Sequence, residues 1–328
     1  MRTNDHREIE YCEAPGQAGG FGLSEDGRVA YLLFDGEQSI GLLGPALRWA
    51  TRESVDRLVI ITDPEPAGVL ARRIGLFAPR SVAPGSVEIR SIKGTGSVPA
   101  VPSERLTPPD LGPDVWALAG LINESGARPV DDHGRLVAEL AGLEVARVTR
   151  DDLGRPLIEV GVGQADRELH QLVHRELAPD TALRRAVAAV AVHRHADARP
   201  HPLNRVARER WLRSVLLDQP SLVGLVSLEA EPPLEPRATV LGNRPVAAKG
   251  RTVDGTVVVV VCSSGVDLDL APQGADYRNR IAPDASLLVV VPHADRYPLT
   301  EELVGLIPNA ELRSMAPPWG EPGDDSSQ

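Results

Sequence analysis

The stretch from Arg244 to Ile307 constrains the fold more than any other part of this sequence. It contains the wholly apolar segment Thr256–Cys262, which follows an Asp254-Gly255 pair typical of a tight β-turn. A second apolar segment, Ser286–Val291, comes later. Short apolar runs bounded by turn residues are typical of fully buried strands. The stretch therefore predicts a β-hairpin, a helix over Asp267–Arg280 and a further strand.

The first third of the chain shows a regular alternation of predicted strands and helices. Apolar runs predict strands, and apolar residues spaced three and four apart predict the helices between them. The order is strand Val29–Phe34, helix Ile40–Ala50, strand Arg57–Ile61, helix Pro66–Phe77 and strand Val87–Ile92. Such alternation is typical of a parallel sheet with right-handed crossovers. The fold class predicted is therefore α/β, with an N-terminal parallel-sheet (Rossmann-like) domain.

Composition suggests how the chain divides. Residues 1–27 are polar and Gly-rich, which predicts a flexible tail, and residues 317–328 predict a disordered one. The proline-rich segment Gly94–Pro113 predicts a linker between a domain at 28–112 and α/β structure at 113–316. Within the latter we expect helices at 115–123, 134–143, 167–176, 181–195, 203–217 and from Leu299, and strands at 143–148, 157–162 and 222–228.

Bulk properties exclude several classes of protein. The longest apolar run, Val257–Cys262, is far shorter than the roughly 20 residues that a membrane helix requires. The N-terminal residues lack the apolar core of a secretory signal. The two cysteines, Cys12 and Cys262, stand far apart, which favours a reduced, cytoplasmic protein. We therefore expect a protein with no membrane partner; oligomerisation remains open.

The order of elements in the last 125 residues resembles the core of the restriction-endonuclease-like, or PD-(D/E)xK, superfamily. The residues that carry this resemblance are a helix over RVARERWLRSVLL, the hairpin Pro245–Cys262, and a following helix with Gln273 and Tyr277. The resemblance implies a C-terminal restriction-endonuclease-like α/β domain. It also implies an acid-x-lysine triplet at the end of the second hairpin strand.

The residues at those positions depart from the family's pattern. The triplet position holds Val261, Cys262 and Ser263, and the first hairpin strand offers Ala248 and Lys249 without a carboxylate. Metal-dependent phosphodiester hydrolysis needs carboxylates to hold a divalent cation. The sequence therefore favours a non-catalytic relative without a cofactor, an interaction or regulatory module whose partner is a protein or nucleic acid.

An alternative is a metal-dependent hydrolase or nuclease that uses Glu144 and Glu159. The segments 142–176 and 244–281 both follow the order strand, turn, strand and helix, which suggests an internal duplication. If Asp152 and Leu153 centre the first turn, Glu159 lies opposite Ala146 and close to Glu144 on one face. Only under this alternative is a divalent cation expected.

Two further groups of residues are candidate ligand-binding sites. His170 and His174 stand four residues apart on a predicted helix, a spacing at which two imidazoles can share a metal. Ligands of parallel sheets bind beyond the carboxyl ends of the strands, here the loops Asp35-Gly36-Glu37 and Thr62-Asp63-Pro64-Glu65. A small-molecule enzyme with its site at these loops is a second alternative, although the loops are acidic and oppose phosphate binding.

An arginine-rich segment is the candidate surface for an anion or a nucleic acid. Trp211 within it could stack on a base. The net charge of −11 and the bias toward arginine, with Lys93 and Lys249 the only lysines, instead favour an ordinary solvated face. The candidate residues are Arg184, Arg185, Arg194, Arg199, Arg205, Arg208, Trp211 and Arg213.

Overall fold

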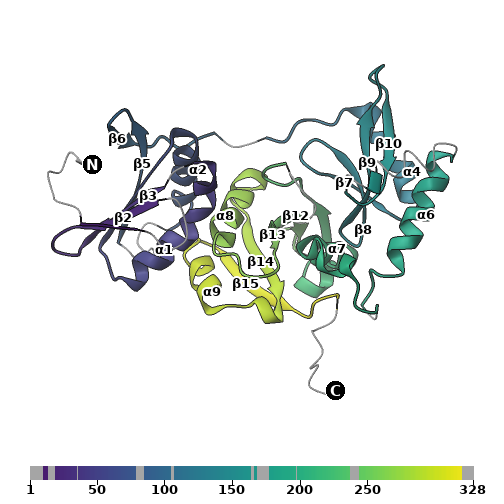
Figure 1. The fold of residues 1–328 in the computed structure, drawn as a ribbon. Helices are drawn as coiled ribbons and strands as arrows, with labels where there is room; N and C mark the ends of the chain where they lie inside the picture. Colours follow the sequence, from purple (N-terminus) through teal and green to yellow (C-terminus); the bar gives the residue numbers. More distant parts are fainter. Residues whose placement is uncertain are drawn as a thin grey trace, which may run out of the picture. The chain divides into compact units, whose positions relative to one another are not determined.

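The computed structural model describes residues 10–13, 19–34, 36–78, 85–104, 107–163, 166–167, 177–196, 198–236 and 244–319. These residues form a mixed α/β architecture with three sheets (Figure 1), which confirms the α/β class predicted from the sequence. The chain divides into two compact units, each made of several segments. Unit 1 comprises residues 1–105, 267–280 and 297–311, and unit 2 comprises 106–266, 281–296 and 312–328.

Unit 1 is built on a six-stranded sheet in which the strands lie in chain order. The three inner strands β3, β4 and β5 are parallel, and helices α1 and α2 connect them. Antiparallel strands flank them on both sides, so the predicted parallel sheet is mixed. The elements are β1 Glu10–Glu13, β2 Gly19–Leu23, β3 Val29–Phe34, η1 Glu37–Leu42, α1 Leu43–Arg52, β4 Arg57–Thr62, α2 Pro64–Ile74, β5 Ser86–Lys93, β6 Gly96–Pro99 and α9 Pro298–Gly305.

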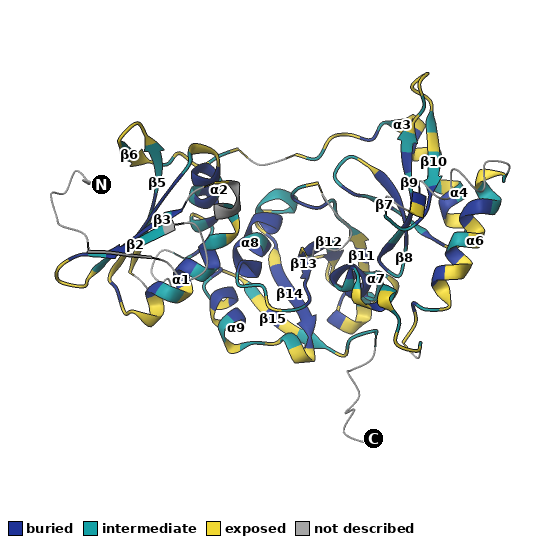
Figure 2. Ribbon diagram, viewed as in Figure 1, coloured by how far each residue is buried: buried dark blue, intermediate teal, exposed yellow. Residues whose placement is uncertain are grey.

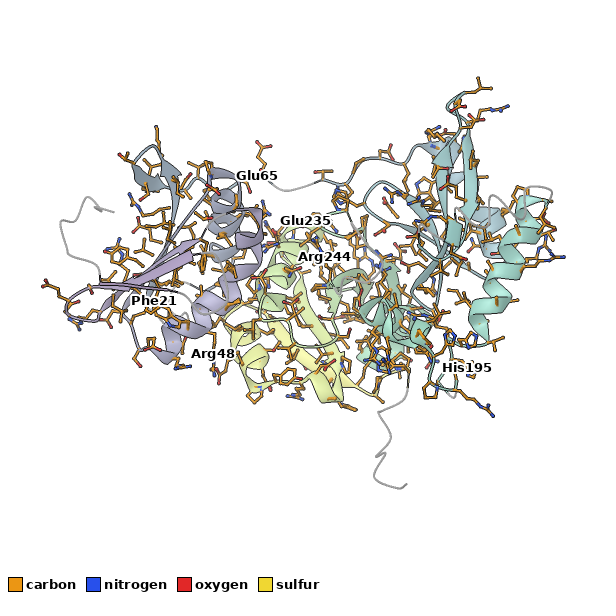
Figure 3. All side chains as sticks on the ribbon, in the orientation of Figure 1. Phe21, Arg48, Glu65, His195, Glu235 and Arg244 are labelled. Atoms are coloured by element: carbon orange, nitrogen blue, oxygen red, sulfur yellow. The ribbon has the colours of Figure 1, made fainter. Side chains whose placement is uncertain are left out.

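The expectation of a flexible tail over residues 1–27 is wrong where the structure describes this segment. Strands β1 and β2 lie in it, and β2 pairs antiparallel with β3. Phe21 of β2, labelled in Figure 3, also packs edge-to-face on Trp49 of α1, with 5.5 Å between ring centroids. Pairing to a buried strand and an aromatic contact therefore offset the low strand propensity of the glycines around Phe21.

Helix α8 (Leu270–Ile281) joins unit 1 through buried ion pairs with α2. Arg72 donates two hydrogen bonds of 2.8 Å to the carboxylate of Asp276, and Arg73 lies 2.8 Å from Asp269. All four side chains are buried. Because an unpaired charge is costly to bury, these pairs tie α8 specifically to α2.

The close approach of α1 to the residues before α8 requires a glycine at position 44. A Cβ there would lie 1.7 Å from the carbonyl oxygen of Leu268, and the Gly44 N–H donates to Asp269 at 3.3 Å. We expect Gly44→Ala to lower the free energy of unfolding by about 3 kcal/mol. Gly41→Ala is the matched control, because a Cβ at position 41 meets nothing within 4 Å, and it should change stability by less than about 0.5 kcal/mol. Urea unfolding checks this, and equal losses in both variants would contradict it.

In unit 2, the antiparallel sheet B has the order β10-β9-β8-β7. Helix α6 covers one of its faces, where Leu183 and Val187 join a core with Leu136, Ala138 and Val148. Figure 2 shows the alternation of buried and exposed residues along α6. The elements are α3 Pro113–Trp116, α4 Ala119–Glu124, β7 Arg128–Asp131, β8 Leu136–Leu140, β9 Leu143–Arg150, β10 Pro156–Val160 and α6 Pro179–Ala191.

The helix predicted over Gly134–Leu143 is wrong, because this segment forms β8 and the turn into β9. Leu140 pairs with Leu143, and the two residues between them, Ala141 and Gly142, have φ of 45° and 77°. Two consecutive positive φ values are the geometry of a two-residue hairpin turn. The spacing of the leucines fits a helix, but the two-residue turn makes the segment a β-hairpin.

Sheet C has the order β11-β12-β13-β14-β15. The hairpin of β12 and β13 is antiparallel, and β13 pairs parallel with β14 after α8. Helix α7 packs against β11, β12 and β13, and Leu212 and Leu216 enter the same core as Val258 and Val260. The elements are η2 Pro202–Arg205, α7 Arg208–Asp218, η3 Pro220–Val223, β11 Ser227–Ala230, β12 Val246–Arg251, β13 Val257–Cys262, β14 Ser286–Pro292, η4 His293–Asp295 and β15 Ala310–Met315.

The two segments of the suggested duplication lie in sheets of different topology. The hairpin of β9 and β10 belongs to an antiparallel sheet, whereas the hairpin of β12 and β13 continues through α8 to a parallel strand. Much of the first segment's predicted helix, 168–176, lies outside the described residues. No helix in the described part of the chain has both the length and the apolar character needed to cross a bilayer.

Candidate functional site

The positions on β12 and β13 where the resemblance to nucleases implies catalytic residues are filled by small and aliphatic side chains. Ala247 pairs with Val261, and Val246 pairs with Cys262. All four side chains are buried. In the described segments no three His, Cys, Asp or Glu side chains gather closely enough to hold a metal ion. This hairpin therefore supplies packing and no ligand set.

Cys262 ends β13 in the core. Its side chain is fully buried, and burial raises the pKa of the thiol to about 12. Because the thiolate is the reactive form, this cysteine is chemically inert in the folded protein.

We expect Cys262 in a Cys12→Ser background to react with a chromogenic thiol reagent at least about a hundredfold more slowly in the folded protein than in denaturant. The reason is the combined effect of burial and the raised pKa. Absorbance at pH 8 follows the release of the chromophore. Rapid stoichiometric reaction of the folded protein would contradict the buried position of Cys262.

The register of the β9–β10 hairpin differs from the predicted one. Glu159 pairs with Arg147 and not with Ala146, so the prediction is wrong by one residue. The two paired residues also form an ion pair, with 3.2 Å between Arg147 Nε and Glu159 Oε2. The carboxylate of Glu159 is therefore neutralised by the residue across from it.

A β-bulge in β9 determines which way Glu144 faces. Ala138 pairs with Ala146, whereas the adjacent Glu139 pairs with Glu144, so that Val145 is an extra residue. Because a bulge interrupts the alternation of side chains along a strand, Glu144 joins the face that carries Glu139. A strict alternation would have put Glu144 on the apolar face together with Ala146.

Glu144 has a guanidinium partner of its own. Arg167 Nη1 lies 2.9 Å from Glu144 Oε1, and both side chains are mostly buried. Burial raises the pKa of Glu144, and the nearby Arg167 offsets part of that rise. Glu144 and Glu159 thus pair with two different arginines, an arrangement that stabilises the sheet face electrostatically instead of leaving both carboxylates to a cation.

The same face of sheet B is held to α7 by a buried ionic network. Glu139 accepts a hydrogen bond of 2.6 Å from Arg210 and one of 3.1 Å from Arg213, and Asp132 accepts from Arg210 at 2.5 Å. These four side chains are all buried. Burial alone would lower the pKa of Arg210, but the nearby carboxylates of Glu139 and Asp132 together outweigh it and raise that pKa. Arg213 also donates to the backbone oxygen of Ala247 on β12, so α7 connects sheet B with sheet C.

A stack of two tryptophan rings between two arginine side chains lies at the start of α7. The Arg194 guanidinium is 4.5 Å from the Trp211 ring, Trp211 is 5.8 Å from Trp319, and Arg208 is 5.0 Å from the Trp319 ring. Arg194 also donates to four backbone carbonyls, those of residues 141, 203, 206 and 207. Burial lowers the pKa of Arg194 to about 10, so it remains cationic at neutral pH.

The predicted anion surface must therefore be corrected for three of its residues. Arg194, Trp211 and Arg213 are buried and engaged in the stack or the ionic network, so they form no part of a surface. Arg208 is half-buried.

The remaining arginines of the predicted surface are exposed. Arg184 pairs with Asp180 on α6, with 2.6 Å between the charged groups. Arg185, Arg199 and Arg205 make no ion pair with any other residue that the structure describes. The exposed His195 lies in the same segment (Figure 3).

At the other predicted sites, the described residues show no arrangement suited to a metal ion or a phosphate group. His170, His174 and Asp35 lie outside the described residues. At the carboxyl ends of β3 and β4, the carboxylate of Asp63 accepts a hydrogen bond of 3.0 Å from the Gly36 N–H. An acidic side chain thus already accepts a hydrogen bond from the backbone of the neighbouring loop.

Two features of the site escaped sequence reasoning. The partners of Arg210 lie more than 70 residues away along the chain, in Asp132 and Glu139. Trp319 fell within a segment predicted to be disordered, 317–328, although its ring packs on α7. A lone tryptophan flanked by Pro317, Pro318 and glycine was the available signal for an anchored segment.

A comparison of the chain with protein-family models, curated proteins and solved structures finds no match.

Proposed function

We propose that this protein is a non-catalytic binding module on a nuclease-like scaffold, and that it contacts the phosphate backbone of nucleic acid. The exposed side chains of Arg185, Arg199 and Arg205 supply the contact. The observation that carries the proposal is the division of the arginine-rich segment into buried residues with partners and exposed residues without an ion pair to a described residue.

The scaffold part of the proposal is supported by topology. The order α7-β11-β12-β13-α8-β14 combines an antiparallel hairpin, a helix and a parallel strand, as expected for the restriction-endonuclease-like core. The proposed lack of catalytic activity is supported by the aliphatic pair Ala247 and Val261 and by the arginine partners of Glu144 and Glu159. Metal-assisted hydrolysis would need carboxylates that converge on one cation.

The binding part is supported by electrostatics. Guanidinium groups bind phosphate oxygens through several N–H donors at once. The net charge of −11 repels a polyanion at long range, so binding should be weak at physiological salt and measurable at low salt.

Binding of a labelled single-stranded oligonucleotide tests the proposal. We expect Arg185→Ala/Arg199→Ala/Arg205→Ala to weaken binding at least about tenfold at 50 mM salt. The matched control removes three other exposed arginines, Arg48, Arg135 and Arg251, and should weaken binding less than about twofold. Equal losses in both variants would contradict a defined contact surface.

The same mixtures, incubated with Mg²⁺ or Mn²⁺, test for catalysis. We expect intact oligonucleotide, because neither strand of the β12–β13 hairpin carries a carboxylate. Metal-dependent cleavage that disappears in Glu159→Gln would overturn the non-catalytic assignment and support the hydrolase alternative instead.

A further inference from the structure

Two histidine side chains of unit 2 stack face to face in the arginine-rich segment. The rings of His193 and His201 are nearly parallel, with 3.8 Å between their centroids and 12° between their planes. His193 lies just beyond the end of α6, and His201 directly precedes the short helix η2. The histidine pair therefore brings together the two ends of the connection between α6 and η2.

Hydrogen bonds to the backbone hold the two rings in this arrangement. The Leu203 N–H donates a hydrogen bond of 3.3 Å to Nδ1 of His201. The carbonyl oxygen of Leu203 accepts a hydrogen bond from the guanidinium of Arg194, the residue next to His193. Leu203 is thus bonded both to one ring and to the chain neighbour of the other. The histidine pair is therefore formed before any ligand binds, and a preformed surface avoids the cost of ordering its side chains.

Solvent still reaches the histidine pair, and exposed arginines lie near it. His193 and His201 are both half-buried, although each ring covers one face of the other. Arg199 precedes His201 by two residues, Arg205 follows it by four, and both arginines are exposed. Because a chain spans at most about 3.6 Å per residue, their Cα atoms lie within about 7 Å and 14 Å of that of His201. An aromatic surface and two cationic groups thus lie close together.

Aromatic rings beside guanidinium groups suit a single strand of nucleic acid. Unpaired bases offer flat faces that stack on aromatic side chains, including histidine. Guanidinium groups at the same place bind the phosphates that link such bases. Inside a duplex, a base is stacked between its neighbours and its faces are not accessible. A stacking surface therefore distinguishes single strands from duplexes.

We propose that the histidine pair His193–His201 is a binding site for an unpaired base of single-stranded nucleic acid. The base continues the stack of the two rings, and Arg199 and Arg205 bind the adjoining phosphates. The inference rests on the proposed function and adds the class of nucleic acid that the surface binds. The rings supply the contact with the base and the arginines supply the contact with phosphate, so different substitutions separate the two contributions.

An abasic strand separates stacking from phosphate contact, because it keeps the phosphates and lacks the bases. At 50 mM salt the unmodified chain should bind a thymidine oligonucleotide at least about fivefold more tightly than an abasic strand of the same length. In His193→Ala/His201→Asn this ratio of affinities should fall below about twofold. Asparagine at position 201 keeps an acceptor for the Leu203 N–H, so the variant removes the ring and preserves the cap of η2.

Two further variants serve as controls for the histidine pair. His195→Ala removes an exposed histidine of the same segment, labelled in Figure 3, and should leave the ratio unchanged. His193→Phe keeps a flat ring beside His201 and should retain the preference for the strand with bases.

The outcomes distinguish this inference from the proposed function. Equal affinities of the unmodified chain for the two strands overturn the stacking site. So does a ratio that survives in His193→Ala/His201→Asn or is lost in His193→Phe. If the abasic strand nevertheless binds, and Arg185→Ala/Arg199→Ala/Arg205→Ala weakens that binding at least about tenfold, the proposed function stands without the stacking site. Binding of neither strand contradicts both.

Discussion

Glu139→Ala is expected to lower the free energy of unfolding by about 3–5 kcal/mol, because it leaves two buried guanidinium groups without their common carboxylate. Glu139 lies on β8 and accepts from both Arg210 and Arg213 of α7. Asp132 remains as a partner of Arg210, so most of the penalty falls on Arg213. Urea unfolding followed by tryptophan fluorescence measures the loss, and Trp211, the residue next to Arg210, contributes to the signal.

The control for this variant is Glu229→Ala, at an exposed glutamate on the edge strand β11. Its effect should stay within about 0.5 kcal/mol. A similar small loss for Glu139→Ala would mean that the network is dispensable. If the network acts only through charge compensation, Glu139→Leu/Arg213→Met should recover much of the stability that Glu139→Ala loses, because well-packed apolar residues can replace buried ion pairs.

Gly142→Ala is expected to be nearly as damaging, with a loss of about 4 kcal/mol. Gly142 has φ of 77° in the turn between β8 and β9, and its Cβ would lie 2.3 Å from backbone atoms of Arg210 and Trp211. Those atoms belong to the first turn of α7 and cannot rotate away as a side chain could. The substitution therefore forces α7 away from sheet B.

Gly154→Ala is the matched control for Gly142→Ala. Gly154 also has φ of 77° in a hairpin turn, but a Cβ there meets nothing within 4 Å. Its loss should be about 1 kcal/mol, which is the effect of the left-handed backbone conformation alone. The difference between the two variants isolates the close contact of the turn with α7. Equal thermal and urea midpoints for the two would refute that contact.

The buried strands of sheet C could be predicted from the sequence because they are apolar without interruption. Strands β13 and β14 are covered on both faces, and such strands lose the alternation of edge strands. The segment from Leu136 to Leu143 could not be read in the same way. Its leucine spacing fits a helix, and only the Ala141-Gly142 turn distinguishes a hairpin.

The candidate site could not be predicted in full, because it depends on contacts between residues that are far apart in the sequence. Whether an arginine is buried is decided by carboxylates elsewhere in the chain, as Glu139 decides it for Arg213. The bulge at Val145 likewise has no clear signal among its apolar neighbours, yet it determines the face on which Glu144 lies. The charge count along residues 184–213 therefore identified an arginine-rich segment. It could not separate the buried, structural arginines from the exposed ones.

The salt dependence of oligonucleotide binding tests the central claim most directly. Three exposed arginines that each displace one counterion from a single strand predict a slope of about −2 for log K against log salt concentration. The slope should fall toward zero in Arg185→Ala/Arg199→Ala/Arg205→Ala. A flat response of the unmodified chain, or no binding at 50 mM salt, would contradict the account of this protein as a nucleic-acid-binding module.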